Sequence, residues 1–129
     1  MNLYYNGINL LEWNLYDQDI NSIDVYWGTS TMRKNDLLLL YVGGQLSQYK
    51  KGICGIAKVK SFPRISENTG RLVVDAQLVK ICELNKPYIE ADKCKEFIKQ
   101  FRSTHRINPI YYHIIFDLFS VKGIYLNQL

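Results

Sequence analysis

The chain has 129 residues, 47% of them apolar and 13% aromatic, and it carries a formal net charge of +4. This length suits one domain over residues 1–129. The apolar content excludes a disordered chain. No apolar run approaches the roughly 18 residues that span a bilayer, and no basic stretch precedes an apolar one at the N-terminus. We therefore expect a cytoplasmic protein that makes no membrane contact.

The three cysteines, Cys54, Cys82 and Cys94, are far apart in the sequence. An odd and unclustered set argues against a disulfide framework and is typical of a reducing compartment. Each is expected to be a small, buried, apolar side chain.

Residues 2–24 show no single period, and we expect a strand followed by a short helix or loop. Residues 36–42 (DLLLLYV) form a continuous apolar run, which predicts a strand buried on both faces. Residues 52–62 predict a second strand, in which Lys58 and Lys60 share the outer face. A turn at residues 66–70 then leads to a third strand over residues 71–81.

The period changes near residue 91. Apolar residues at i, i+3, i+4 and i+7 predict an amphipathic helix over residues 91–101. Asn108 and Pro109 are typical of a helix start, and residues 111–119 favour a buried helix over a strand. Three sequential strands followed by helices predict a small α+β fold rather than an alternating nucleotide-binding sheet.

Searches for catalytic motifs give little. The chain has no Gly-rich phosphate loop, no GxSxG elbow, and no CxxC or HExxH spacing, so we expect no enzyme, no metal and no cofactor. Cys54 as a nucleophile with His105 as its base is conceivable, but a thiol in an apolar strand is usually inert.

A recognition motif is easier to find. Trp27, Gly28, Thr29 and Ser30 directly precede a polar turn that leads into the apolar strand. An indole face beside open backbone and two hydroxyls is what one planar base requires, because stacking contributes about 1–3 kcal/mol per base. On composition alone, a core Trp27 and a turn Gly28 would be the commoner interpretation.

Cations cluster between residues 92 and 106. Lys93, Lys95, Lys99, Arg102 and Arg106 occur there with His105, against only two acidic residues. Such a cluster suits contacts with phosphates. A solvated helix surface explains it equally well.

The segment 27–61 resembles the EVE domain, a branch of the PUA-like superfamily that also includes YTH and ASCH domains. The matching pieces are Trp27-Gly28, the turn at residues 33–36 (RKND), the apolar run ending at Tyr41, and residues 52–59 (GICGIAKV). Asn35 stands where the family usually has Gly, which is a mild departure because Asn tolerates left-handed backbone.

The resemblance implies a PUA-like β-barrel (pseudobarrel) with flanking helices, whose pocket accepts a nucleobase of DNA or RNA, often modified or flipped out. Such modules stand alone or form the N-terminal targeting part of modification-dependent restriction systems, so the resemblance allows a fused or associated nuclease or NTPase subunit as a partner. The residues expected to bind the base are Trp27, Gly28, Thr29, Ser30, Tyr26, Tyr41, Ser103 and His105. Those expected to bind phosphates are Lys58, Lys60, Lys95, Lys99, Arg102 and Arg106.

Two other classes stay open. A small-molecule-binding or amidohydrolase-like barrel enzyme would need Lys58 or Lys34 beside an acid such as Asp36 or Asp75 in its pocket. A protein-interaction module would instead show an exposed apolar patch and no cavity lined by tryptophan.

Overall fold

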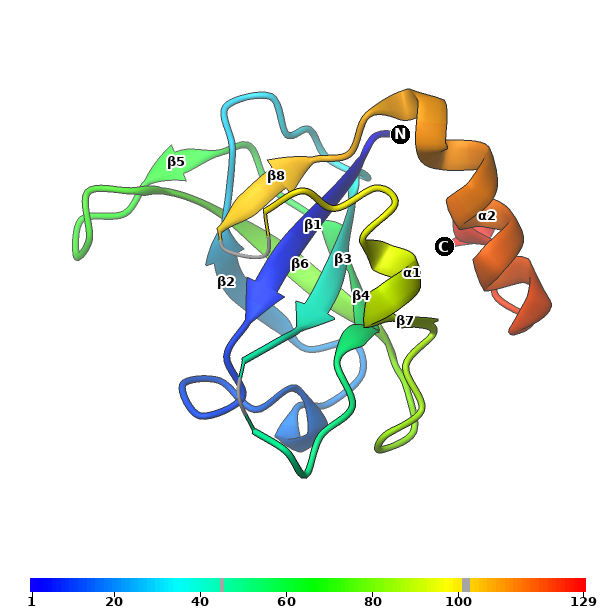
Figure 1. The fold of residues 1–129 in the computed structure, drawn as a ribbon. Helices are drawn as coiled ribbons and strands as arrows, with labels where there is room; N and C mark the ends of the chain where they lie inside the picture. Colours follow the sequence, from blue (N-terminus) through cyan, green and yellow to red (C-terminus); the bar gives the residue numbers. More distant parts are fainter. Residues whose placement is uncertain (45, 101–102) are drawn as a thin grey trace.

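A strongly curled sheet forms a half-barrel in the computed structural model, which describes residues 1–44, 46–100 and 103–129 (Figure 1). The strand order is β2-β6-β4-β3-β1-β8, with β5 beside β6 and β7 beside β4. The strands are β1 (Leu3–Ile8), β2 (Ile23–Trp27), β3 (Leu37–Val42), β4 (Gly52–Val59), β5 (Arg64–Ile65), β6 (Leu72–Ile81), β7 (Ile89–Glu90) and β8 (Thr104–Arg106). Only the β1–β3 pair is parallel among the described residues. The predicted small, β-rich α+β fold is confirmed at this level.

Strand β3 separates two apolar cores. Its side chains alternate between them, with Leu37 and Leu39 in the outer core and Leu38 and Leu40 in the inner core. All of its residues are buried, because a strand covered on both faces has no side for water. The buried strand expected at residues 36–42 is therefore confirmed. Strand β4 ends at Val59, earlier than predicted.

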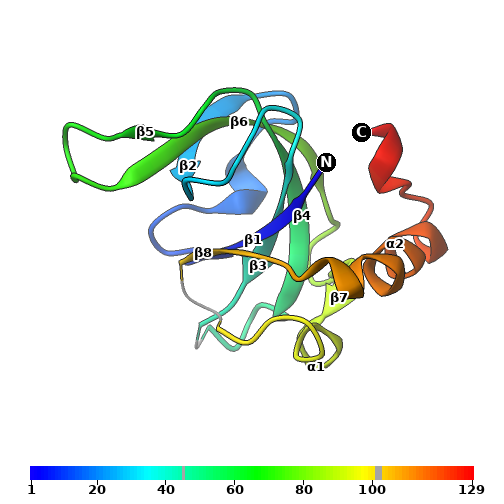
Figure 2. The same cartoon turned by 90° about the horizontal axis from the view of Figure 1, so that it is seen from above.

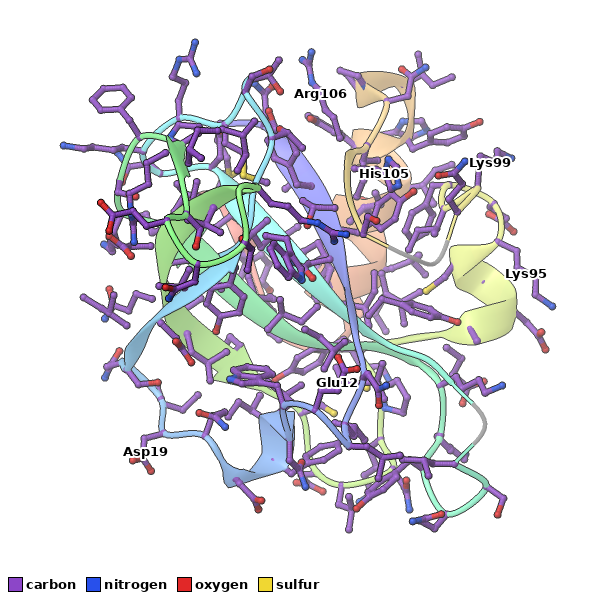
Figure 3. All side chains as sticks on the ribbon, turned by 90° about the vertical axis from the view of Figure 1, so that its left-hand side faces the viewer. Glu12, Asp19, Lys95, Lys99, His105 and Arg106 are labelled. Atoms are coloured by element: carbon purple, nitrogen blue, oxygen red, sulfur yellow. The ribbon has the colours of Figure 1, made fainter. Side chains whose placement is uncertain are left out.

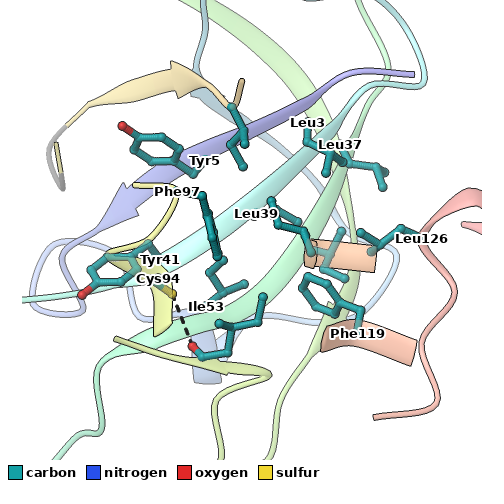
Figure 4. Packing of buried hydrophobic residues seen from close by; sticks show 14 of the residues in the cluster. Leu3, Tyr5, Leu37, Leu39, Tyr41, Ile53, Cys94, Phe97, Phe119 and Leu126 are labelled. Carbon is teal, nitrogen blue, oxygen red and sulfur yellow. Dashed lines mark hydrogen bonds between the residues drawn. The ribbon is translucent and has the colours of Figure 1, made fainter. Parts of the chain in front are cut away.

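The outer core lies between the sheet and the C-terminal helices (Figures 2 and 4). Helix α2 (Tyr112–Val121) places Ile115 and Phe119 in this core, and both are fully buried. The 3₁₀ helix η2 (Pro109–Tyr111) precedes it, and the side chain of Asn108 accepts a hydrogen bond from the backbone N–H of Ile110. The predicted helix start at Asn108 and the helix over residues 111–119 are confirmed, but the helix is not buried throughout, since only Ile115 and Phe119 of α2 are buried.

The helix predicted over residues 91–101 is wrong in length. Helix α1 (Ala91–Cys94) has one turn, after which Phe97 and Ile98 both bond to the carbonyl of Cys94. This tight turn already buries the three apolar side chains against the sheet, so no longer helix is needed. The last apolar position of the predicted pattern, Phe101, lies outside the described residues.

The inner core fills the concave side of the sheet. It includes Tyr4, Cys54 and Leu78, and it is closed by the 3₁₀ helix η1 (Leu15–Asp17), whose Leu15 is fully buried. All three cysteines of the chain are buried and free, as predicted.

The two ends of the curled sheet meet at a seam. Strand β2 pairs only with β6, and no ladder joins β2 to β1 or β8 within the described ranges. Instead, the carbonyl of Trp27 accepts hydrogen bonds from Asn6 Nδ2 (3.3 Å) and Thr104 Oγ1 (3.0 Å). Both donor residues are buried. Side chains therefore bridge the two edges of the half-barrel here, and a cavity lies between the strands.

Candidate functional site

A cavity of about 300 Å³ opens at this seam. This volume lies at the small end of the range of ligand sites in proteins, which suits a guest of one planar ring system. Its walls come from β1, the loop after it, β2, β6 and the hairpin between β5 and β6. The lining residues are Asn6, Gly7, Ile8, Asn9, Glu12, Trp13, Val25, Tyr26, Trp27, Ser66, Asn68, Thr69 and Val73.

Three aromatic residues line the cavity, and the rings of two of them are fixed by their neighbours. Trp13 meets Tyr26 edge to face, with ring centroids 5.6 Å apart and planes at 73°. The indole N–H of Trp13 donates to Asp24 Oδ2 at 3.1 Å. Burial, and then the charge of Asp24, raise the pKa of Tyr26 above its ordinary value. Tyr26 therefore keeps its phenol neutral, and the two rings form a rigid wall.

Trp27 is the third ring, and it stays accessible. It follows Ile23 and Val25 on the outward-facing side of β2, and its side chain leaves the residue 39% exposed. The Arg71 guanidinium lies over the ring, 5.3 Å from its centroid. This cation–π contact places a positive charge at the cavity mouth. The indole is not enclosed in the core, so it remains available to a planar guest.

The backbone of β2 offers polar groups at the same place. The N–H of Gly28 bonds to the carbonyl of Leu72 in β6. In an antiparallel ladder the backbone groups of alternate residues point to opposite sides, so those of Val25 and Trp27 point away from β6, toward the seam. The Trp27 carbonyl accepts the hydrogen bonds of Asn6 and Thr104 across the seam. The Trp27 N–H and the Val25 carbonyl remain as a donor and an acceptor on the cavity side.

Short turns shape the polar rim. The loop after β1 is held by Asn9, whose Oδ1 accepts the N–H of Leu11 and whose carbonyl accepts the N–H groups of Glu12 and Trp13. On the opposite side, the predicted turn at residues 66–70 is confirmed, with Gly70 at φ 69°. Because each turn is fixed by its own hydrogen bonds, the rim is formed before any ligand binds.

Two of the predicted base-binding residues, Tyr26 and Trp27, line this cavity. Gly28 lies next to it, and a Cβ on Gly28 would come within 3.2 Å of the Val74 side chain. Its role is thus close packing of β2 against β6, with no direct contact with a guest.

Thr29, Ser30 and Tyr41 are not among the residues that line the cavity. The hydroxyl of Thr29 bonds to that of Thr31, and the carbonyl of Ser30 accepts from Arg33. Tyr41 belongs to the outer core. The structure therefore does not bring these three residues together with Trp27 around the cavity.

Ser103, directly before β8, and His105, within it, flank the seam. The carbonyl of Ser103 accepts the N–H of Gly7, and the His105 ring lies 5.4 Å from the Tyr5 ring. Neither residue lines the cavity. Thr104, between them, is the one that reaches Trp27, through its hydrogen bond to the carbonyl.

The predicted phosphate-binding residues are dispersed. Lys58 is half-buried and donates to the carbonyl of Leu129 at 2.8 Å. Lys95 pairs with Asp92, and it lies with Lys99 at the edge of the view, away from Glu12 (Figure 3). Arg106 donates to the side chain of Asn2, Lys60 is exposed at the end of β4, and Arg102 lies outside the described residues.

Three cations lie on or next to the β5–β6 hairpin, and one of them, Lys60, is among the predicted phosphate-binding residues. We call Lys60, Arg64 and Arg71 the hairpin cations, because they surround the β5–β6 hairpin that supplies one wall. Arg64 pairs with Asp75 at 2.9 Å, and the backbone N–H of Lys60 donates to the carbonyl of Asp75. Arg71 covers Trp27. Arg71 thus contacts a residue that lines the cavity.

The groups considered for catalysis are engaged elsewhere. The buried carboxylate of Asp36 accepts the N–H groups of Asn2 and Arg33, and Lys34 lies over the Phe62 ring. None of these residues lines the cavity. Over the ranges that the structure describes, no three His, Cys, Asp or Glu side chains are grouped so as to hold a metal ion.

Cys82 is the most reactive thiol that the structure predicts. The hydrogen bond with the Cys54 thiol has the largest effect on the pKa of Cys82 and lowers it. Burial raises this pKa and the hydrogen bond with the Tyr16 hydroxyl lowers it, so that it lies at about 7. Burial raises the pKa of Cys94, and the neighbouring Cys82 together with burial raises that of Cys54. Alkylation with iodoacetamide should therefore reach Cys82 first, at a rate that rises with pH through about 7 as the thiolate forms. Peptide mapping of the folded protein measures this order, and preferential labelling of Cys94 would contradict it.

Several cavity residues were not expected from the sequence. Trp13, Glu12 and Asn6 fall in the N-terminal stretch whose period is ambiguous. The available signal was Trp13 itself, since the chain has only two Trp residues and both line the cavity.

Comparisons with known proteins give information on the fold alone. No family model matches the chain, and no curated protein matches it. An NMR structure of Rpa0253 from Rhodopseudomonas palustris, a structural genomics target, is similar with a TM-score of 0.65 at 12% identity, over 94% of each chain. At this identity the likeness concerns the fold alone. No helix in the described part of the chain has the length and apolar character needed to cross a membrane.

Proposed function

We propose that this chain is a nucleic-acid-binding module of PUA/EVE-like type that holds one nucleobase in the seam cavity. The observation that carries the proposal is the set of three aromatic residues, Trp13, Tyr26 and Trp27, around a cavity of about 300 Å³ with a polar rim. The protein in this proposal binds and does not catalyse, and it acts in the cytoplasm.

The cavity is proposed to recognise a base in two ways, by stacking on its face and by hydrogen bonding to its edge. A base has a π-face that stacks on an aromatic side chain, and a polar edge that needs donors and acceptors. Trp13 and Tyr26 form a rigid wall, while the exposed Trp27 provides a stacking face. The Trp27 N–H and the Val25 carbonyl then replace Thr29 and Ser30 as the groups that meet the base edge.

The hairpin cations fit the nucleic-acid backbone. A base inserted beside Trp27 brings its phosphates to the cavity mouth, where Arg71 lies over the indole. Contacts of Arg and Lys with phosphates give affinity that does not depend on sequence and that weakens with salt. Binding of a modified or flipped base, and service to an associated nuclease or NTPase, are extensions of the proposal that rest on the resemblance to EVE domains.

The test is binding of fluorescently labelled single-stranded DNA and RNA oligonucleotides, followed by anisotropy at two salt concentrations. We expect binding that weakens as salt rises, and a further loss in Arg71→Ala of severalfold with a smaller salt slope. Lys95→Ala is the matched control, because Lys95 is exposed and lies away from the cavity. Absence of binding to every oligonucleotide would refute the proposal. Equal losses in the two variants would refute the role of Arg71.

A further inference from the structure

We infer that Glu12 makes the seam cavity selective for bases that carry an exocyclic amino group. This inference rests on the proposed function, and it names the chemical class of base that the same cavity accepts.

Glu12 is unusual among the residues around the cavity. It is the one charged side chain among the described lining residues. Its carboxylate makes no hydrogen bond or ion pair within the parts of the chain that the structure describes, whereas the nearby Asp24 is fully engaged by Trp13 and the N–H of Val25. The turn that begins at Asn9 holds the backbone of Glu12 through a 3.0 Å hydrogen bond. The backbone of Glu12 is thus fixed at the cavity rim, and its exposed carboxylate has no protein partner among the described residues.

The edge of β2 and the Glu12 side chain supply an unequal set of polar groups to the cavity. An ionised carboxylate only accepts hydrogen bonds, and the Val25 carbonyl also only accepts. The Trp27 N–H only donates. The strand edge and Glu12 together therefore offer two acceptors and one donor to a guest. The negative charge of Asp24, which helps to raise the pKa of the Tyr26 phenol, adds to the bias against further acceptors.

The nucleobases fall into two groups when their pairing edges are compared with these two acceptors and one donor. Cytosine, adenine and guanine each carry an exocyclic amino group, so the pairing edge of each offers two amino hydrogens together with at least one acceptor. Uracil, thymine and hypoxanthine lack the amino group, and their edges offer a single N–H beside carbonyl oxygens. One of those oxygens, or a desolvated carboxylate without a donor, would then be left unsatisfied, and such a mismatch costs more than a good contact gains.

The test uses pairs of guests that differ only in the amino group. Short single-stranded oligonucleotides carry one base between abasic positions, in the pairs cytosine against uracil and guanine against hypoxanthine. We expect the amino-bearing base of each pair to bind about tenfold more tightly, within the range of discrimination that a good base-edge contact provides. Glu12→Gln should reduce the ratio to about twofold, because an amide both donates and accepts. Glu67→Gln, at an exposed position on the hairpin turn, should leave the ratio unchanged.

Each outcome separates the two claims. A ratio near one in the unaltered protein, or a ratio that Glu12→Gln does not change, overturns the selectivity inference even if Trp27→Ala abolishes binding. If neither Trp27→Ala nor the removal of the central base changes the affinity, the proposed function itself is overturned, and the selectivity inference with it.

Discussion

Trp27→Ala is expected to weaken binding of a single-stranded oligonucleotide by about 5- to 150-fold, the equivalent of the roughly 1–3 kcal/mol that one stacked base contributes. The indole is 39% exposed and contributes little to either core, so the free energy of unfolding should change by less than about 1 kcal/mol. Titration of labelled oligonucleotides measures the first quantity, and urea denaturation measures the second.

Phe62→Ala is the matched control for this experiment. Phe62 is also an exposed aromatic residue, at 62%, but it contacts Lys34 and does not line the cavity. Trp27→Phe should keep part of the affinity, since a smaller ring still stacks. Equal affinities for Trp27→Ala, Phe62→Ala and the unaltered protein would show that the guest does not stack on Trp27.

Asp36→Ala is expected to lower the free energy of unfolding by about 2–4 kcal/mol, because it leaves two backbone donors without their partner. The carboxylate of Asp36 accepts the N–H of Asn2 and the N–H of Arg33, each at 2.8 Å, and the residue is only 3% exposed. These bonds tie the start of β1 to the turn before β3. Their loss should therefore loosen the parallel β1–β3 pair and, with it, the cavity.

Urea denaturation of three variants checks this account. Asp36→Asn keeps one accepting oxygen and should lose roughly half as much stability as Asp36→Ala. Asp117→Ala removes an exposed carboxylate from α2 and should stay within about 0.5 kcal/mol of the parent protein. A loss for Asp36→Ala no larger than that for Asp117→Ala would mean that water replaces the carboxylate without cost.

The sequence was most informative where local rules decide the structure. The run at residues 36–42 predicted β3, because only a strand covered on both faces needs every side chain to be apolar. Asn35 has φ 75°, the left-handed conformation that its place in the turn motif requires. Asn108 and Pro109 predicted the start of the C-terminal helical region for the same kind of local reason.

The pattern of apolar residues was less informative about helix length. Cys94, Phe97 and Ile98 have helical spacing, but a single turn of helix and the following tight turn bury them all. Periodicity reports which side chains face the core, and it does not report how far the backbone remains helical once they are buried.

The site was harder to predict, because residues distant in the sequence assemble it. Trp27 and Tyr26 were found through a local motif, yet the seam is bridged at Trp27 by Asn6 and by Thr104, 77 positions away. The cations at residues 92–106 were predicted to contact phosphates only because they are close together in the sequence. Arg71, a single residue in a turn region, has the more specific contact, since its guanidinium covers the Trp27 ring.

The most direct measurement uses the two indole N–H signals in an NMR titration with a short single-stranded oligonucleotide. The chain has only two Trp residues, and both line the cavity, so these signals report on the cavity alone. Base binding at the seam predicts that the Trp13 and Trp27 indole signals shift together and saturate at one affinity. Unchanged indole signals, with shifts confined to the backbone around Lys95 and Lys99, would contradict it.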